Sequence, residues 1–220
     1  MSIEVALNNN TYWDEIVIGG KTFMIRRVEN IDRLIEAISD EEFNVDERLP
    51  YWAEIWPSSI ALSEYVLENE DEFSGKKILE LGCGLGLVGI VLTSIGGDVL
   101  FTDYDSHALQ FTQENFYRNF KRPASVQLLD WRDPGSTQSF DIVVAADIIY
   151  EKRWLEPVLN VLDKKLATYG RAYIADPDRT VGRPVFELMV DKNWYRQPLL
   201  KPTTVYNKLH HIVINRISKC

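Results

Sequence analysis

The chain has 220 residues, of which 45% are hydrophobic and 26% are charged. This length fits one globular domain with a modest extension, and the composition excludes a disordered or fibrous chain. Acidic residues outnumber basic ones by 33 to 24, which gives a net charge of −9. That balance argues against a nucleic-acid-binding surface, because such surfaces depend on Lys and Arg to neutralise phosphates.

The cysteine content and the N-terminal segment indicate the cellular compartment of the protein. Two cysteines, Cys83 and Cys220, are too few for a disulfide framework and predict a reducing environment. The first 20 residues contain no Lys or Arg, so they match neither a secretory signal nor an Arg-rich transit peptide. No apolar run approaches the ~20 residues of a membrane-spanning helix. We therefore expect a soluble cytoplasmic protein whose partners include neither a membrane nor a nucleic acid.

The N-terminal part of the chain predicts a small extension. Residues 15–25 contain two β-rich runs joined by Gly19-Gly20, a pattern typical of a two-residue hairpin turn. A short helical stretch from Ile31 to Ser39 and an acidic loop follow. We interpret residues 1–48 as an extension made of a hairpin and a helix, and residues 49–220 as the main domain.

From Lys76 onward, short apolar runs alternate with helical patterns. Runs such as IVVAA (142–146) lack polar alternation, which is typical of parallel strands covered by helices on both faces. The alternation predicts an α/β fold with a doubly wound, mostly parallel sheet. The run at 210–217 indicates a late antiparallel strand. The predicted parallel strands are residues 77–81, 98–103, 125–129, 140–147 and 171–176, and apolar residues at helical spacing predict helices over 105–120 and 155–166.

The most informative stretch is ILELGCGLGLVGI (78–90), a strand followed by a glycine-rich turn and the start of a helix. It satisfies G-x-G-x-x-G from Gly84 to Gly89, the dinucleotide fingerprint, which is a weak signal when it stands alone. It also satisfies E-x-G-x-G-x-G from Glu80 to Gly86. A tight strand–helix turn that binds nothing is the simplest alternative. The chain after Lys76 is too short for a dinucleotide domain and a separate catalytic domain.

Acidic residues end the next two strands. Asp103 lies 17 residues after Gly86, where a carboxylate can accept hydrogen bonds from both ribose hydroxyls of an adenosine. The alternative for Asp103 is a cap for the helix that starts near Ser106. Asp130 ends the third strand and is a candidate acceptor for an adenine amino group. Trp131 beside it would stack or donate there, or pack as a core residue.

The pattern from Glu80 to Gly86 resembles motif I of class I S-adenosylmethionine-dependent methyltransferases. An acid at position 80 suits the cationic amino-acid end of that cofactor and would repel a pyrophosphate. The resemblance implies a Rossmann-like methyltransferase domain over residues 49–220, with a seven-stranded sheet and S-adenosylmethionine as its cofactor.

Two further segments make the resemblance more specific. LPYWAEIWPSSIAL (49–62) places aromatic residues ahead of a helix that begins near Pro57, and DIIY (147–150) follows the fourth strand. Together with motif I they resemble the seven-strand lysine methyltransferases. PYWAEIWP and ADPDRTVGRP (175–184) are most similar to the lysine methyltransferases of the electron-transfer flavoprotein β-subunit. The second segment is longer than the DPGRP-like motif of those enzymes, because Asp178, Thr180 and Val181 surround Arg179.

The resemblance implies roles for individual residues. Asp147 and Tyr150 fall where the substrate amine meets the methyl donor, and Tyr51 and Trp52 would help to wall the channel for the alkyl chain. Plain packing is the alternative for Trp52, Tyr150 and Trp56. The implied cofactor contacts are Trp56, Gly82, Cys83, Gly84, Asp103, Trp131 and Ala146, to which the residue types at strand ends add Glu80 and Asp130.

The implied activity is methyl transfer to a lysine ε-amine of a protein, with the electron-transfer flavoprotein β-subunit as the leading acceptor. A small-molecule amine N-methyltransferase is the alternative, since fold and cofactor do not choose the acceptor. A non-catalytic binding module and an NAD-dependent oxidoreductase are further alternatives. His107, His210 and His211 show no metal-ligand spacing, so we predict no metal.

Overall fold

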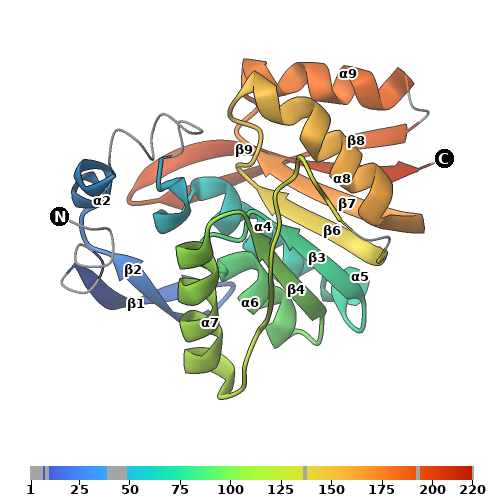
Figure 1. The fold of residues 1–220 in the computed structure, drawn as a ribbon. Helices are drawn as coiled ribbons and strands as arrows, with labels where there is room; N and C mark the ends of the chain where they lie inside the picture. Colours follow the sequence, from blue (N-terminus) through green and yellow to red (C-terminus); the bar gives the residue numbers. More distant parts are fainter. Residues whose placement is uncertain (1–6, 8–9, 39–48, 136–137, 192–193, 220) are drawn as a thin grey trace.

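A seven-stranded sheet forms the centre of the molecule. The computed structural model describes residue 7 and residues 10–38, 49–135, 138–191 and 194–219. Strands follow the order β5-β4-β3-β6-β7-β9-β8 (Figure 1). Neighbours from β5 to β7 pair in parallel, and β9 and β8 are antiparallel. The bounds are β3 (Lys77–Leu81), β4 (Asp98–Asp103), β5 (Ser125–Leu128), β6 (Phe140–Ala146), β7 (Leu166–Asp176), β8 (Trp194–Val205) and β9 (Lys208–Lys219). The predicted doubly wound, mostly parallel sheet is confirmed.

Helices cover both faces of the sheet, and the strand residues alternate between two cores accordingly. In β6, Val144 belongs to the core under α4, α6 and α7, whereas Val143 belongs to the core under α8 and α9. A parallel strand that is covered on both sides is apolar throughout, which explains the IVVAA run. The helices are α4 (Pro57–Glu68), α5 (Glu70–Phe73), α6 (Leu87–Ser94), α7 (Ser106–Phe120), α8 (Leu155–Lys165) and α9 (Arg183–Asp191).

The predicted N-terminal hairpin is present as a separate two-stranded sheet of β1 (Thr11–Ile18) and β2 (Lys21–Val28). Gly19 and Gly20 connect the strands with φ of 55° and 78°, values that glycine adopts at no steric cost. The following helix α2 (Asp32–Ala37) is shorter than the predicted stretch. The acidic loop predicted after it lies outside the described residues.

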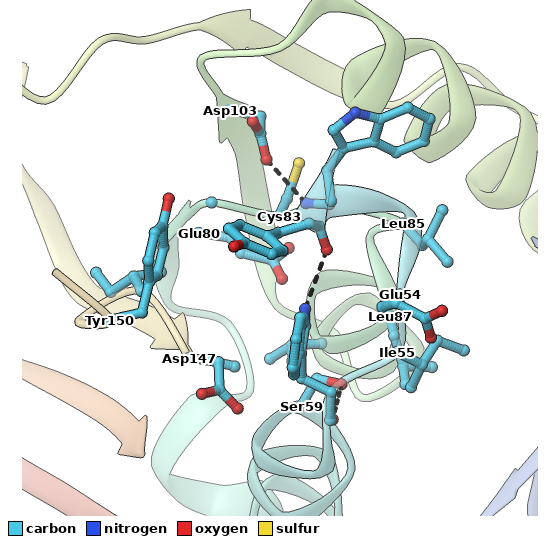
Figure 2. A pocket seen from close by; sticks show the side chains of 18 of the residues that line it. Glu54, Ile55, Ser59, Glu80, Cys83, Leu85, Leu87, Asp103, Asp147 and Tyr150 are labelled. Atoms are coloured by element: carbon cyan, nitrogen blue, oxygen red, sulfur yellow. Dashed lines mark hydrogen bonds between the residues drawn. The ribbon is translucent and has the colours of Figure 1, made fainter. Parts of the chain in front are cut away.

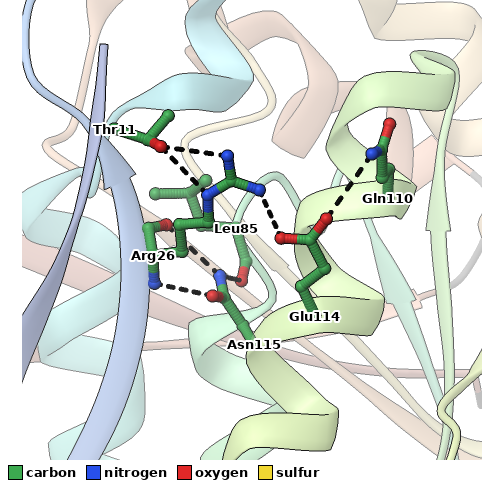
Figure 3. A network of polar contacts seen from close by, with 6 residues as sticks. All are labelled: Thr11, Arg26, Leu85, Gln110, Glu114 and Asn115. Atoms are coloured by element: carbon green, nitrogen blue, oxygen red, sulfur yellow. Dashed lines mark hydrogen bonds and ion pairs between the residues drawn. The ribbon is translucent and has the colours of Figure 1, made fainter. Parts of the chain in front are cut away.

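Two asparagine side chains attach the hairpin to helix α7. Asn119 pairs with both backbone groups of Met24, accepting from its N–H at 3.0 Å and donating to its carbonyl at 2.8 Å. One turn earlier, Asn115 accepts from the Arg26 N–H at 2.6 Å and donates to the Leu85 carbonyl at 2.9 Å (Figure 3). The amides therefore satisfy the outer edge of β2, and Asn115 also joins the hairpin to the glycine-rich turn.

The sequence did not predict β8. This strand contains Pro198 and Pro202, and proline lacks the N–H that a central strand needs. In the structure β8 lies at the edge of the sheet and pairs only with β9. Its outer side has no neighbouring strand, so a proline that lacks an N–H loses no hydrogen bond there. Tyr206 and Asn207 connect the two strands with positive φ, as in a tight hairpin turn. Across the described residues, no helix has both the length and the apolar composition to span a membrane.

Candidate functional site

A cavity opens at the carboxyl ends of β3, β4 and β6, next to the segment that precedes α4 (Figure 2). We call it the first cavity; it encloses about 700 Å³ between side chains, part of which is open to solvent. Open α/β sheets bind ligands in this position. Among the residues that the sequence singled out, those lining the first cavity are Tyr51, Trp52, Trp56, Glu80, Gly82, Cys83, Gly84, Asp103, Trp131, Ala146, Asp147 and Tyr150. Asp130 is not among them.

The glycine-rich turn is shaped by its neighbours at two points. Gly84 has a φ of 52°, and a Cβ there would lie 2.9 Å from the Trp52 carbonyl oxygen. Gly89 lies in α6, where a Cβ would come within 2.4 Å of Oε2 of Glu80. Because both positions lack a side chain, the turn approaches the aromatic segment and the helix approaches the buried acid. The Gly89 N–H donates to Glu80 at 3.1 Å.

Glu80 is a buried acid in the wall of the first cavity. Burial raises its pKa to about 8, although the Gly89 N–H favours the ionised form. A carboxyl group with this pKa is largely protonated near neutral pH, and a cation placed beside it would favour ionisation. The position therefore suits a positively charged group of a ligand.

Asp103 faces the glycine-rich turn and does not cap the following helix. Its Oδ2 accepts from the Gly84 N–H at 3.0 Å, and its Oδ1 accepts from the Asp105 N–H at 3.0 Å. Asp105 is the cap of α7, since its side chain accepts from the His107 N–H at 2.8 Å. Burial raises the pKa of Asp103 to about 6 against these bonds. A carboxylate offers about four lone-pair sites, so Asp103 keeps the capacity to accept from a ligand hydroxyl.

Trp131 and Asp130 are placed differently although they are adjacent. Trp131 is buried beside Gly82 and packs edge-on against Trp154 at 5.6 Å. Within the described part of the chain, its Nε1 has no hydrogen-bond partner, which leaves a buried donor in a residue of the cavity wall. The carboxylate of Asp130 instead accepts from Nε of Arg132 at 2.9 Å. A cofactor role for Asp130 stays a prediction.

Cys83 contributes a buried thiol to the same wall. Its Sγ lies 3.4 Å from Oγ1 of Thr112, and burial raises the pKa of the thiol. The side chain therefore stays protonated and packs as a small apolar group.

A second cavity adjoins the first and shares one wall with it. Tyr51, Trp56, Asp147 and Tyr150 line both cavities. Tyr51 packs edge-on against Trp56 at 6.1 Å and against Tyr150 at 5.5 Å. Trp52 lines the first cavity but not the second, and its ring packs against Phe111 at 5.1 Å. The shared wall thus consists of three aromatic rings and one carboxylate.

Glu151 and Arg179 complete the second cavity, which encloses about 710 Å³ with its opening to solvent. Arg179 forms an ion pair with Asp147, a contact that the sequence analysis did not foresee. Asp147 follows β6 and Arg179 follows β7, and adjacent parallel strands end at the same edge of the sheet. The sequence signal that could have predicted this ion pair is the opposite charge of two residues that follow neighbouring parallel strands. Asp147 has a φ of 58°, and its N–H donates to the Ala175 carbonyl at 2.9 Å.

Comparison with protein families gives a clear assignment for this architecture. The family model described as "Lysine methyltransferase" matches residues 45–192, more than half of the chain. The chain belongs to the lysine methyltransferase family. The family is the one expected from motif I and DIIY, and the fold is that of S-adenosylmethionine-dependent methyltransferases.

Individual relatives agree with this membership. The chain is 34% identical over 143 residues to EEF1A lysine methyltransferase 3 of Mus musculus, covering 62% of this chain and 60% of the relative. It is 32% identical over 145 residues to an electron transfer flavoprotein beta subunit lysine methyltransferase homolog of Caenorhabditis elegans, covering 59% of each. The chain thus spans about 60% of the length of these relatives.

Solved structures show the same fold at low sequence identity. The N-methyltransferase NodS of Bradyrhizobium japonicum, solved with S-adenosyl-L-homocysteine, superposes with a TM-score of 0.59 at 15% identity. The match covers 82% of this chain and 93% of NodS.

The residues of the first cavity fit S-adenosylmethionine. That molecule carries a sulfonium and an ammonium group, and the cavity presents two buried acids, Glu80 and Asp103. Trp131 adds a buried N–H donor without a partner among the described residues. A histidine, cysteine and carboxylate cluster that could hold a metal ion is not found in the described ranges.

Proposed function

We propose that this chain transfers methyl groups from S-adenosylmethionine to the ε-amine of a lysine in a partner protein. The observation that carries this proposal is the wall shared by the two cavities. One cavity has the acids and glycine turn that suit the cofactor, and the other opens to solvent beside Asp147 and Tyr150. A methyl group presented from the first cavity would meet an amine that enters through the second.

The proposed cofactor contacts follow from the geometry above. Asp103 would accept from the ribose hydroxyls, Glu80 would face the cationic amino-acid end, and Trp131 would offer its indole N–H. Asp130 belongs to this proposal from sequence alone. When bound, S-adenosylmethionine supplies a methyl group on a positively charged sulfur, whose C–S bond breaks as the amine lone pair forms a C–N bond. The chain itself supplies alignment and a shielded environment.

The aromatic wall would guide the substrate side chain. Tyr51, Trp56 and Tyr150 form a surface on which an unbranched alkyl chain can lie, and such rings also attract a nearby cation. Burial and the nearby charge of Glu151 raise the pKa of Tyr150 to about 12. Its hydroxyl therefore stays protonated and does not act as a base. Asp147 would orient the amine nitrogen through a carboxylate oxygen.

The β-subunit of an electron-transfer flavoprotein is our leading acceptor, and EEF1A is the second. The PYWAEIWP and DPDR segments support the first choice, and the names of the two relatives above support both. A net charge of −9 would attract a basic surface around the target lysine. Salt screens this attraction beyond ~8–10 Å. The buried free thiol of Cys83 supports a cytoplasmic location.

Intact-mass measurement tests this function. Each purified candidate is incubated with the chain and S-adenosylmethionine, and the modified residue is located by peptide mass spectrometry. We expect steps of one to three methyl groups on a lysine, absent after a Lys→Arg substitution in the acceptor. Methylation of free amines with no change in either protein would instead favour the small-molecule amine methyltransferase.

A further inference from the structure

An ion-pair cluster lies at the mouth of the second cavity. A single guanidinium nitrogen of Arg179, Nη1, contacts Asp147 and also lies 3.2 Å from Oδ2 of Asp176. Oδ1 of Asp176 accepts from the Arg179 backbone N–H at 2.8 Å. Both carboxylate side chains are about 95% buried, with exposures of 5% and 4%, whereas the arginine side chain is 31% exposed. Arg179 therefore bridges the loops after β6 and β7 and still reaches the cavity.

Several other charged residues lie near this cluster, and most of them already have a partner of opposite charge. Glu151 lines the cavity and pairs with Arg153 at 2.8 Å. The phenol of Tyr150 is uncharged near neutral pH, because its pKa is raised to about 12. Further along the loop, Asp178 pairs with Arg183 at 3.3 Å on the surface, and Arg196 lies within electrostatic range of Asp178. Of the described residues that line the second cavity, Arg179 is the only cation.

A lysine amine has to be neutral to attack a methyl group, yet its ordinary pKa is about 10.4. A carboxylate without a cationic partner would make this worse, because a nearby negative charge stabilises the ammonium form. At Asp147 a guanidinium lies against the carboxylate and offsets its charge. Positive charge beside the amine favours loss of its proton to solvent.

We propose that Arg179 is a positioning residue that holds the Asp147 carboxylate and keeps the incoming amine in its neutral form. The inference rests on the proposed function and adds to it the control of substrate protonation. Arg179 engages Oδ1 of Asp147, so Oδ2 is the oxygen that can accept an N–H of the neutral amine. Asp176 opposes the effect, because it adds a second negative charge to the cluster.

The two neighbours of the amine therefore predict opposite effects on the pH dependence. Arg179→Gln removes a positive charge and raises the pKa of the bound amine, which moves the rising limb of kcat toward alkaline pH. Asp176→Asn removes a negative charge, keeps the side-chain size, and moves the same limb toward acid pH. A merely structural role would lower kcat at every pH without moving the limb in opposite directions.

The test measures initial rates of methylation of the purified electron-transfer flavoprotein β-subunit and of EEF1A from about pH 6 to about pH 10, a range that extends from well below to near the ordinary lysine pKa of about 10.4. We expect Arg179→Gln to shift the midpoint upward by about one pH unit and to lower kcat at neutral pH without raising the KM for the acceptor. Arg179→Lys keeps the charge and should keep the wild-type midpoint. Arg183→Gln is the matched control, since Arg183 pairs with the exposed Asp178 in the same loop.

Calorimetry with S-adenosylhomocysteine shows whether each variant is folded, because none of the three substituted residues lines the first cavity. A midpoint that stays fixed in both Arg179→Gln and Asp176→Asn, while the wild type methylates lysine, overturns the role proposed for Arg179. That outcome leaves the proposed function standing. If Arg179→Gln does not fold, an unmoved or alkaline midpoint in Asp176→Asn overturns it. A wild-type chain that methylates no lysine on either protein overturns the proposed function, and this inference with it.

Discussion

The two cavities differ in how the chain builds them. The first cavity takes its polar groups from strand ends, and backbone N–H groups of the turn after β3 and of α6 bond to its two acids. The second cavity takes its residues from three separate segments, before α4, after β6 and after β7, and a single ion pair joins two of them. The acids of the first cavity are thus held by backbone groups, whereas the geometry of the second cavity depends on a contact between side chains of two loops.

The largest effect should follow from removing Asp147. Its carboxylate lies in the shared wall, so Asp147→Ala should lower turnover by about a hundredfold or more through misplacement of the amine. Binding of S-adenosylhomocysteine, measured by calorimetry, should change little. Loss of both together would assign Asp147 to cofactor binding or to structural support and remove the distinction between the two cavities.

Replacement of Asp103 should instead weaken cofactor binding. Asp103→Ala deletes charged acceptors that contribute ~1.5–3 kcal/mol each, so affinity for S-adenosylhomocysteine should fall by at least about tenfold. The Gly84 N–H would also lose its partner, which makes Asp103→Asn a useful milder variant. Unchanged affinity in both variants would place the ribose elsewhere.

The raised pKa of Asp103 predicts a pH dependence of cofactor binding. The free site has a pKa of about 6, and hydroxyl donors bind the ionised form better. Affinity for S-adenosylhomocysteine should therefore be full above this pH and fall as the pH drops below about 6, because a proton competes with the ligand. Asp103→Asn should lack this step, and any step near the pKa of Glu80, about 8, should persist in it. A wild-type affinity that is flat below pH 6 contradicts the assignment.

The smallest effect concerns how the hairpin supports the first cavity. Asn115 and Asn119 both bind β2, but Asn115 alone of the two also holds the Leu85 carbonyl in the glycine-rich turn (Figure 3). Asn115→Ala should weaken S-adenosylhomocysteine binding about three- to tenfold, the equivalent of one hydrogen bond. Asn119→Ala should lower the thermal midpoint but leave the affinity unchanged. Equal losses of affinity in both would show that the hairpin as a whole supports the site.

The same contrast separates what the sequence predicted from what it did not. Strand β3, the turn after it and the hairpin were recognised because each depends on a local pattern of apolar residues and glycines. The contact between Asp147 and Arg179 was not, because it joins residues 32 positions apart and requires β6 and β7 to be neighbours. Strand β8 was missed because its two prolines are tolerated only at a sheet edge, and edge position is a property of the whole sheet. The boundary between an extension at 1–48 and a domain at 49–220 stays a prediction.

A structure of the chain crystallised with S-adenosylhomocysteine tests the central claim, that one cavity holds the cofactor and the other admits the acceptor. We predict the ribose hydroxyls within hydrogen-bonding distance of Asp103, the indole N–H of Trp131 close to the ligand, and the sulfur directed toward Asp147 and Tyr150. A ligand bound in the second cavity, or one whose sulfur faces away from the shared wall, would contradict the account.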